Sequence, residues 1–302
     1  MKVVLIISSS IDVTTDYIIK EYSNEADFYR INVDEFSKYR IDIGGCCQWI
    51  ISCDEWKLEK ASVDSIYYRK PILPDLSEYD PNYHGMISKD IISLINGIAD
   101  DFEGKVLTRP CILRKTENKT FQLLYALRNG LIIPKSYIGN DKEAVAQCLN
   151  NGKSIIKPLT TGKVKKCDGI ELFQTNYICE IQNDISLTPL YVQSYQEKKY
   201  EVRVTCINDS IFAVRIDSED KLDWRKNYAG IHYSIIDCPI EVKNCCLNMM
   251  RDLGLIFGAF DFIVNLNDEW VFLEVNPNGQ WLWLEQILNI SISRGIVQYL
   301  IS

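Results

Sequence analysis

Histidine is scarce in this sequence, and its cysteines lack the spacing of a metal-binding motif. The 302 residues include two histidines and eleven cysteines, but no Cys-x-x-Cys pair occurs; Cys46-Cys47 and Cys245-Cys246 are directly adjacent. Structural zinc sites draw their ligands from closely spaced cysteines and histidines. A zinc-stabilised module is therefore not expected. We expect the cysteines to be reduced and mostly buried, acting as small apolar side chains.

A long apolar run and an excess of positive charge are also missing. The opening Met1–Ser8 lacks the full apolar stretch and the cleavage site of a signal peptide, and no later segment approaches the length of a membrane span. The formal net charge is −8, whereas nucleic-acid-binding proteins usually present a basic face. We therefore expect a cytoplasmic protein that binds neither nucleic acid nor a membrane.

The rest of the composition is that of a globular protein, with 47% hydrophobic and 25% charged residues in a chain long enough for two or three subdomains. Its first part alternates strand-like and helix-like segments. The expected order is strand, helix, strand, strand, helix, at Lys2–Ser8, Asp12–Tyr22, Asp27–Val33, Val63–Lys70 and Pro81–Asp101. This order predicts a small α/β domain over residues 1–108. Arg69 and Lys70 end the last of these strands, and we expect them to be solvated; contact with a phosphate or a partner is the alternative.

A break in composition at Arg109-Pro110 opens a second section of the chain. Its expected elements are a helix at Asn118–Asn129 ended by Gly130, a helix from a capping-box-like start at Asn140 to Asn150, and a short strand at Ser154–Pro158. Two lysines here are candidates for binding phosphate. Lys157 lies in the apolar strand, where an ammonium group is costly to bury without an anion, and Lys119 lies at a helix start. For each lysine taken singly, the alternative to phosphate binding is a structural or solvated role.

The third section begins with a strand at Tyr191–Gln196 and continues with two strands around Asn208-Asp209-Ser210. We expect a three-residue loop there, because its register puts the apolar side chains of both strands on one face. The opposite face then carries the charged side chains Glu201, Arg203, Arg215 and Asp217. Either the two acids neutralise the two arginines, or the arginines stabilise a phosphoryl group in transfer.

A hairpin near the end of the chain organises this section. Its strands are Gly258–Asn265 and Trp270–Pro277, joined by a two-residue turn at Asn267-Asp268. This register pairs Asp261 with Glu274, and Asn276 projects from the same face. Facing carboxylates repel one another unless a hard cation such as Mg²⁺ lies between them. An edge hairpin with solvated carboxylates is the alternative, but the run Glu274-Val-Asn-Pro-Asn-Gly in so apolar a segment favours the metal site.

With these motifs the chain resembles the ATP-grasp ligases, and within them it is similar to the microviridin-type graspetide synthetases, which are peptide-modifying macrocyclases. The Asp-x12-Glu-x-Asn spacing of Asp261, Glu274 and Asn276 is highly characteristic of the superfamily. The peptide-modifying branch is indicated by Asp223-Trp224-Arg225 and by the segment that runs from Asn276 to Trp281. Other matching segments extend the resemblance over nearly the whole chain, at Asn118-Lys119, Gly130–Pro134, Ile156–Leu159, Val192–Tyr195, Glu201–Arg203 and Phe212–Ser218.

The resemblance implies an α/β (α+β) ATP-grasp fold with three domains. These are an N-terminal pre-ATP-grasp domain at residues 1–108, a central lid domain at 109–190 and a C-terminal catalytic domain at 191–302. It implies ATP and Mg²⁺ as cofactors, a homodimer, and a ribosomally made precursor peptide as substrate, with a leader recognised near the central domain. The implied reaction activates Asp or Glu side chains as acyl phosphates, which Ser, Thr or Lys side chains then attack to close ester or amide rings.

The resemblance also implies a role for each site residue. It implies phosphate-binding lysines at Lys119 and Lys157, and an adenine-binding hinge at Gln193, Ser194 and Tyr195. It also implies a nucleotide-contacting acid at Glu201. Arg203 and Arg215 match arginines near the γ-phosphate and the acyl phosphate, and Asp223 and Arg225 match a motif that handles the core peptide. Asp261, Glu274 and Asn276 match the Mg²⁺ ligands. Two other functions stay open: an ATP-grasp ligase that joins a free amino acid to a peptide or protein, and a non-catalytic ATP-binding regulatory protein.

Overall fold

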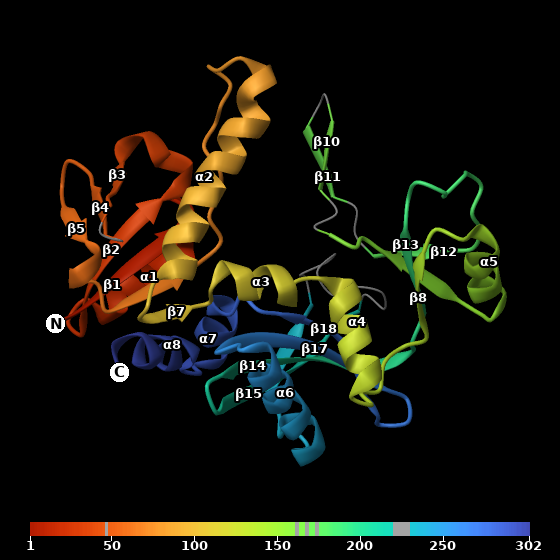
Figure 1. The fold of residues 1–302 in the computed structure, drawn as a ribbon. Coiled ribbons are helices and arrows are strands. Elements are labelled where there is room, and N and C mark those ends of the chain that lie inside the picture. Colours follow the sequence, from red (N-terminus) through yellow and green to blue (C-terminus); the bar gives the residue numbers. More distant parts are fainter. Residues whose placement is uncertain (46–47, 161–162, 167–168, 173–174, 220–229) are drawn as a thin grey trace.

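The computed structural model of the chain (Figure 1) describes residues 1–302 except 46–47, 161–162, 167–168, 173–174 and 220–229. Within the described residues, the strands form three larger sheets and two small antiparallel ones. The three larger sheets follow one another along the chain. In Figure 1 the first lies at the left, the second at the right and the third at the bottom centre. The result is the mixed α/β architecture that the sequence predicts.

The first sheet is parallel, with the strand order β2-β1-β6-β7. Its elements are β1 (Lys2–Ser8), α1 (Val13–Tyr22), β2 (Ala26–Asn32), β6 (Ser65–Tyr68), α2 (Pro81–Asp101) and β7 (Lys105–Leu107). The predicted strands and helices of this region are confirmed to within a few residues at their ends. The connection from β2 to β6, which the sequence left unassigned, holds further short elements: η1 (Val33–Lys38), β3 (Arg40–Ile43), β4 (Trp49–Ser52), β5 (Lys57–Glu59) and η2 (Lys60–Ser62).

Strand β1 is buried on both of its faces, as its continuous apolar run predicts. Leu5 and Ile7 belong to a hydrophobic cluster that includes the inner face of α2. Val4 and Ile6 belong to a second cluster, which they share with Trp281 and with the last helices of the chain. These helices are α7 (Leu282–Leu288) and α8 (Ile292–Ile301). The end of the chain therefore packs against the sheet formed by its beginning.

The second sheet is antiparallel, with the order β12-β9-β13-β8, and α5 packs against it. The elements of this part are α3 (Pro110–Thr116), α4 (Lys119–Arg128), β8 (Ser136–Gly139), α5 (Lys142–Asn150), β9 (Ser154–Lys157), the separate hairpin β10 (Lys163–Lys166) and β11 (Gly169–Leu172), β12 (Asn176–Ile178) and β13 (Leu190–Ser194). The predicted helices and the strand at β9 are confirmed, and Asn118 caps α4. The predicted cap of α5 is wrong by one residue. Asp141, not Asn140, accepts hydrogen bonds from the first backbone N–H groups of that helix.

The third sheet is antiparallel, with the order β16-β15-β14-β17-β18. Its elements are β14 (Lys198–Ile207), β15 (Ser210–Asp217), β16 (His232–Ile235), α6 (Ile240–Leu253), β17 (Phe257–Asn265) and β18 (Trp270–Asn276). Helix α6 covers one face, where Met249 and Met250 share a cluster with Val202 and Phe260. Helices α7 and α8 lie between the other face and the first sheet. The predicted border between the lid domain and the catalytic domain, between residues 190 and 191, falls after the first residue of β13. The division into three domains stays a prediction.

The turn of the last hairpin differs from the prediction, although its key pairing is confirmed. Asn265 donates a backbone hydrogen bond to Glu269, so the loop has three residues, and Asp268 adopts the left-handed conformation at φ 65°. A bulge at Leu273, between the pairs Phe262–Phe272 and Asp261–Glu274, then restores the register. Asp261 is therefore opposite Glu274, as predicted, because two irregularities compensate.

The register predicted between β14 and β15 is wrong by one residue. Ile207 pairs with Ser210, so the loop has two residues, Asn208 with φ 49° and Asp209. Arg203 consequently pairs with Val214, not with Arg215. Because directly paired residues share a face, the two arginines lie on opposite faces of the sheet rather than side by side.

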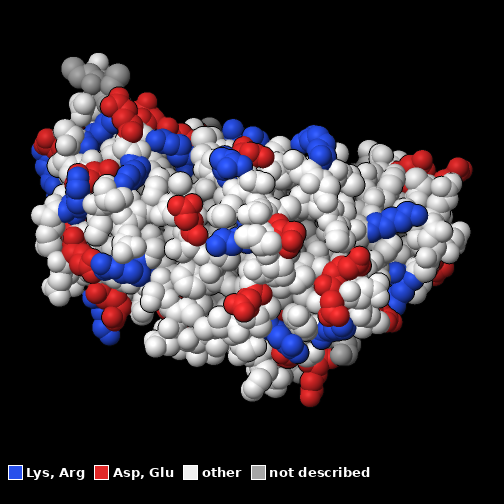
Figure 2. All heavy atoms as spheres, turned by 90° about the horizontal axis from the view of Figure 1, so that it is seen from below, with Lys and Arg blue, Asp and Glu red and all other residues white. Residues whose placement is uncertain are grey.

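The cysteines and the surface charge complete the description. All eight cysteines in the described residues are free, but only Cys206 and Cys246 are buried, so the prediction that most are buried is wrong. No helix among the described residues is long and apolar enough to cross a membrane. On the face seen in Figure 2, the lower side of Figure 1, basic and acidic side chains are interspersed among uncharged residues.

Candidate active site

The three oxygen-bearing side chains predicted to bind a metal converge at one point. Asp261 comes from β17, and Glu274 and Asn276 come from β18. The Asn276 Nδ2 atom lies 3.1 Å from Asp261 Oδ2 and 3.4 Å from Glu274 Oε1. The Asp261 side chain is 10% exposed and that of Glu274 is 29% exposed. The cluster Asp261, Glu274 and Asn276, called the acidic trio below, is thus shielded from bulk water but reachable from a cavity.

A buried glutamine holds β18 in the position that brings the acidic trio together. Gln122, on α4, accepts a hydrogen bond from the Val275 backbone N–H at 2.9 Å and donates one to the Val275 carbonyl at 2.8 Å. Since β18 is an edge strand, these bonds satisfy backbone groups that no neighbouring strand can pair. Gln122 is a functional residue that the sequence reasoning missed, because its partner lies 153 residues further along the chain.

Two cations already face the carboxylates of the acidic trio. Arg203, on β14, places its Nε atom 3.1 Å from Asp261 Oδ1. Lys119, at the start of α4, places its ammonium 3.9 Å from Glu274 Oε2 and donates a hydrogen bond of 2.9 Å to the Pro158 carbonyl. The Arg203 guanidinium is buried, and its Nη1 atom has no hydrogen-bond partner in the described part of the chain. Such a donor suits an anionic oxygen supplied by a ligand.

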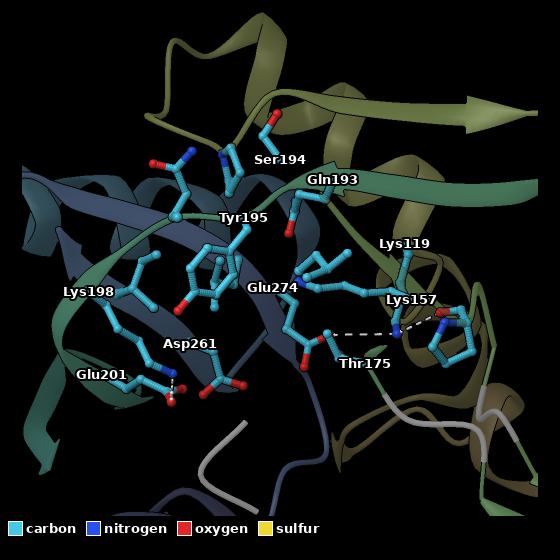
Figure 3. A pocket seen from close by; sticks show the side chains of 16 residues that line it. Lys119, Lys157, Thr175, Gln193, Ser194, Tyr195, Lys198, Glu201, Asp261 and Glu274 are labelled. Carbon is cyan, nitrogen blue, oxygen red and sulfur yellow. Dashed lines mark hydrogen bonds and ion pairs between the residues drawn. The ribbon is translucent and has the colours of Figure 1, made fainter. Parts of the chain in front are cut away.

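A cavity of about 220 Å³ opens between the second and third sheets beside the acidic trio. All six residues predicted to bind the nucleotide line it, together with two members of the trio: Lys119, Lys157, Gln193, Ser194, Tyr195, Glu201, Asp261 and Glu274. In Figure 3 the lysines Lys119 and Lys157 lie on one side, Lys198 and Glu201 lie on the other, and the two carboxylates lie between them. The cavity therefore combines a cationic side with an acidic floor.

Two details of this cavity bear on a nucleotide. The Gln193 amide donates hydrogen bonds to Ser136 Oγ and Tyr191 Oη, which leaves its buried Oε1 without a partner among the described residues. A buried unpaired acceptor of this kind suits a donor such as the amino group of adenine. The backbone N–H groups of Ser194 and Tyr195, in contrast, already donate to carbonyls of the protein.

A second cavity, of about 700 Å³, lies on the other side of the acidic trio. It opens between the first and third sheets and is lined by residues from both: Lys70, Glu117, Arg203, Tyr233, Glu274, Asn276, Pro277, Asn278, Gly279, Gln280, Trp283 and Ile287. Glu274 lines both cavities, Asp261 lines the first and Asn276 lines the second. The acidic trio therefore stands at the junction of two separate binding spaces.

The remaining predicted site residues are Arg215, Asp223 and Arg225. Arg215 lies on the opposite face of the sheet, where it makes two 2.7 Å hydrogen bonds to Asp217 and stacks 4.0 Å from the centre of the Tyr200 ring. The structure therefore does not bring Arg215 to Arg203. Asp223 and Arg225 lie outside the described residues.

Arg69 is the second functional residue that the sequence reasoning missed, since it is buried rather than solvated, with 1% of its side chain exposed. It donates hydrogen bonds to the Asn278 carbonyl at 3.0 Å, the Asn278 side chain at 2.6 Å, the Gly279 carbonyl at 3.1 Å and the Gln280 side chain at 2.6 Å. These groups begin two residues after Asn276 in the chain. Arg69 thus ties the segment behind the acidic trio to the first sheet.

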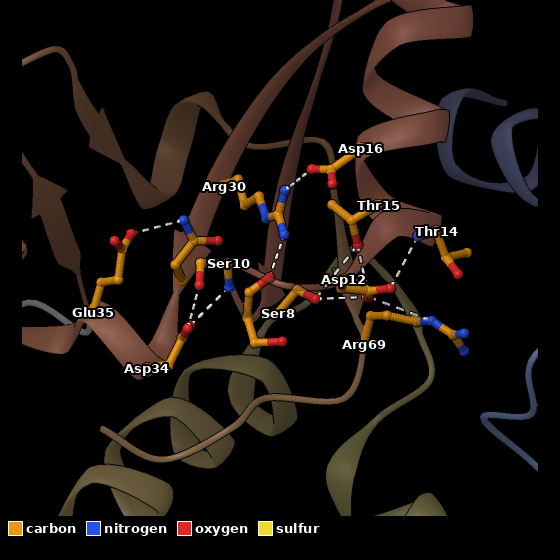
Figure 4. Close-up of polar contacts among 12 residues, drawn as sticks. Ser8, Ser10, Asp12, Thr14, Thr15, Asp16, Arg30, Asp34, Glu35 and Arg69 are labelled. Atoms are coloured by element: carbon orange, nitrogen blue, oxygen red, sulfur yellow. Dashed lines mark hydrogen bonds and ion pairs between the residues drawn. The ribbon is translucent and has the colours of Figure 1, made fainter. Parts of the chain in front are cut away.

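Asp12 provides the counter-charge for Arg69 (Figure 4), with its Oδ2 atom 3.6 Å from Arg69 Nε. Ser8 and Thr15 donate hydrogen bonds to the same carboxylate, as does the Thr14 backbone. Burial opposes ionisation of Asp12, but the Arg69 guanidinium and these hydrogen bonds outweigh it and hold the pKa of the carboxyl below its ordinary value.

No protein-family model matches this chain, and no curated protein matches it in sequence. Solved structures do match it over its whole length. The macrocyclase MdnC from Microcystis aeruginosa, bound with the precursor peptide MdnA, is 25% identical with a TM-score of 0.88, covering 99% of each chain. The macrocyclase MdnB from the same organism is 25% identical with a TM-score of 0.81, covering 100% of this chain and 99% of that one.

A third structure extends the comparison to another organism. The RiPP-associated ATP-grasp ligase of Chryseobacterium gregarium, in complex with ADP and a leader and core peptide, is 22% identical with a TM-score of 0.86, covering 100% of this chain and 95% of that one. Both cavities and the acidic trio thus occur in a chain whose fold matches these ligases from end to end. The chain therefore has the fold of the ATP-grasp ligases and is similar over its whole length to the peptide macrocyclases among them.

Proposed function

We propose that this protein uses ATP to activate Asp or Glu side chains of a ribosomally made precursor peptide and joins them to Ser, Thr or Lys side chains of the same peptide. The products are macrocyclic esters or amides, as in graspetide biosynthesis. The observation that carries the proposal is the position of the acidic trio at the junction of two cavities. Phosphoryl transfer between two substrates requires this arrangement, because both must reach one charged centre from different sides.

The first cavity fits ATP, which the matching ligases hold as ADP or an ATP analogue. Lys119 and Lys157 are placed for the phosphates, and the hinge from Gln193 to Tyr195 is placed for adenine. We assign Glu201, which Lys198 pairs at 2.5 Å, to contact with the nucleotide. These roles are proposed from the lining of the cavity and from the sequence resemblance.

The acidic trio is suited to Mg²⁺, which prefers carboxylate, carbonyl and water oxygens. Asp261 and Glu274 offer carboxylate oxygens, and Asn276 offers its amide oxygen once the amide turns, since its nitrogen now faces the two carboxylates. When bound, Mg²⁺ neutralises charge on the phosphate oxygens. The like-charged Asp261 and Glu274 are held face to face by Arg203 and Lys119.

The reaction then proceeds in two balanced steps. A carboxylate oxygen of the peptide attacks the γ-phosphorus of ATP, the bond to the β-phosphate oxygen breaks, and ADP and an acyl phosphate result. A hydroxyl or amine of the peptide attacks the acyl carbon, loses its proton and expels inorganic phosphate. Arg203, whose Nη1 donor has no hydrogen-bond partner among the described residues, stabilises the charge that develops on the transferred group. We propose that Asp223 orients or deprotonates the attacking group and that Arg225 holds the acidic side chain, as the resemblance implies.

The test is incubation of the protein, ATP and Mg²⁺ with short peptides that contain Asp or Glu together with Ser, Thr or Lys, chosen from the reading frames beside its gene, followed by mass spectrometry. Each link formed removes one water from the peptide. Replacing Asp261→Asn and Glu274→Gln together is expected to abolish the loss of water while the protein stays folded. Asp268→Asn, in the turn of the same hairpin, is the matched control, because Asn also adopts the left-handed conformation that Asp268 has.

Three results would contradict the proposal. Unchanged activity in the double variant would remove the metal assignment. A gain in mass equal to one amino acid would indicate a ligase for free amino acids. Release of no ADP with any peptide would favour a regulatory ATP-binding protein.

We also propose the partners and the organisation of the enzyme. Three features are proposed from the resemblance. The enzyme is a homodimer, and its substrate has a leader that is recognised near the central domain. The chain divides into three domains, at residues 1–108, 109–190 and 191–302. A cytoplasmic location is proposed because the reaction consumes ATP. Light scattering in solution tests the dimer, and a leader peptide added separately tests recognition.

A further inference from the structure

Lys70 occupies a position at which α/β sheets commonly bind ligands. The strand order β2-β1-β6-β7 means that the chain leaves β1 toward one side of the sheet and later continues from β6 toward the other. Ligands bind in the crevice outside the carboxyl ends of such neighbouring strands. Lys70 follows β6 by two residues and has a φ of 22°, in the left-handed region that non-glycine residues rarely adopt.

The surroundings of Lys70 leave its ammonium available to an anion. Within the described residues, no hydrogen bond or ion pair within 4 Å satisfies it. The guanidinium of its neighbour Arg69 donates hydrogen bonds to Asn278, Gly279 and Gln280. Lys70 is therefore the cation that this strand end presents to the second cavity.

Charged groups around Lys70 come from three elements. Arg69 and Asp12 lie on the first sheet and its loops, Glu117 ends α3, and Arg203 lies on β14. Displacement of water lowers the pKa of Lys70 to about 8, and the charges of Arg69 and Arg203 add to this effect, whereas Asp12 and Glu117 oppose it. Burial in turn raises the pKa of the Glu117 carboxyl. Lys70 itself is exposed and lines the second cavity, so an added carboxylate can reach its ammonium.

The opposite wall of the cavity supplies the reacting centre. Glu274 and Asn276 of the acidic trio line it, and so does Arg203. Next to them Tyr233 and Trp283 pack with ring centres 4.9 Å apart, which gives the wall an apolar surface for the aliphatic part of a side chain. A carboxylate held between Lys70 and this wall faces the acidic trio from the side away from the nucleotide.

We propose that Lys70 binds the side-chain carboxylate of the peptide that is to be activated, within the second cavity, and positions it for attack on the γ-phosphorus. This inference rests on the proposed function and adds a second residue that contacts the acidic side chain, beside the one that the resemblance implies. Lys70 contacts the substrate directly and uses its charge, not a proton transfer.

The experiment measures binding of a small probe, N-acetyl-glutamate α-methylamide, to the protein in the presence of ADP and Mg²⁺. The probe carries one side-chain carboxylate and no other charge. N-acetyl-glutamine methylamide is its neutral counterpart. The variants are Lys70→Met, Lys70→Arg and, as the matched control, Lys20→Met, which removes the charge of an exposed lysine at the end of α1.

The expected result is saturable binding of the acidic probe by the wild type and a loss of affinity of about 10- to 100-fold in Lys70→Met, the range for a hydrogen bond to a charged group. Lys70→Arg is expected to keep most of the affinity, Lys20→Met all of it, and the neutral probe to bind weakly throughout. With the precursor peptide, Lys70→Met is expected to raise the KM for the peptide while the affinity for ADP stays the same.

Several outcomes would overturn the inference. Equal probe affinity in wild type and Lys70→Met, or no saturable binding by the wild type, would each do so. A loss of affinity for AMPPNP but not for the probe would assign Lys70 to the γ-phosphate instead. The two proposals fail separately. If no peptide is cyclised, the proposed function fails and the probe still decides the role of Lys70. If the peptide is cyclised equally well by Lys70→Met, only the inference fails.

Discussion

Replacing Arg69 by methionine is expected to damage both the stability and the activity of the enzyme. Methionine keeps the length and the apolar part of the side chain but removes the charge and every donor. The change takes away four hydrogen bonds to Asn278, Gly279 and Gln280 and leaves Asp12 without its cation. The segment that these bonds hold begins two residues after Asn276.

The size of the effect follows from the burial of the pair. Arg69 is 1% exposed and Asp12 is 6% exposed, so solvent screens their interaction little. Removing one partner of a buried ion pair typically costs about 3–5 kcal/mol, because the other charge stays buried. The Ser8 and Thr15 hydroxyls still hydrogen-bond Asp12, which favours the lower end, about 3 kcal/mol. The substitution Arg69→Lys would keep the charge but not the fork of donors, and is expected to lose less.

Urea unfolding followed by tryptophan fluorescence measures this stability, since Trp281 is completely buried directly after the tethered segment. Peptide cyclisation measured below the unfolding transition reports on the acidic trio. Arg30→Met is a comparison at another acid-paired arginine of the same sheet, and its partner Asp16 is 57% exposed. A loss below about 1 kcal/mol in Arg69→Met, or activity equal to that of the wild type, would refute the idea that Arg69 anchors the segment.

Two further predictions concern stability. Asp12→Asn is expected to cost about 1.5–3 kcal/mol of unfolding free energy at pH 7. Because the folded pKa of Asp12 lies below its ordinary 3.8, this contribution is present above that pH and is lost as the pH falls through the folded value. The urea midpoints of the two proteins should therefore converge in acid, and a constant difference down to pH 2 would contradict the linkage. Gly258→Ala is expected to destabilise the third sheet by about 1–3 kcal/mol, because the added Cβ would lie 2.7 Å from the Met250 sulfur. A thermal midpoint equal to that of the wild type would contradict this and would show that Met250 moves aside freely.

The acidic trio was accessible to sequence reasoning because its members obey local rules. Strand alternation places Glu274 and Asn276 on one face, and an apolar hairpin limits the pairings open to Asp261. The loop length was not accessible in the same way. Asp268 adopts a left-handed conformation that few non-glycine residues favour, and the bulge at Leu273 leaves no mark in the apolar pattern. The correct pairing emerged although both details were mispredicted.

The failure for Arg215 has a different cause. The apolar pattern of β14 and β15 fits two registers, because β15 carries apolar side chains on both faces: Ile211 and Ala213 on one, Phe212 and Val214 on the other. Asn208, with its positive φ, favours the shorter loop. Arg69 and Gln122 escaped prediction because their partners are distant in the chain, at Asn278 and Val275. Polar residues that bridge such separations look locally like any solvated side chain.

The tether between Arg69 and Asn278 limits how this enzyme can be recombined with its relatives. Helix α8 packs on β1, β6 and β7, so the last stretch of the chain belongs physically with the first. A hybrid that takes residues 1–108 from one ligase and everything else from another would mismatch this interface and shift Asn276 as well. A hybrid that also exchanges residues 277–302 keeps both sides of the contact from one parent, and should inherit the nucleotide pocket of the other intact.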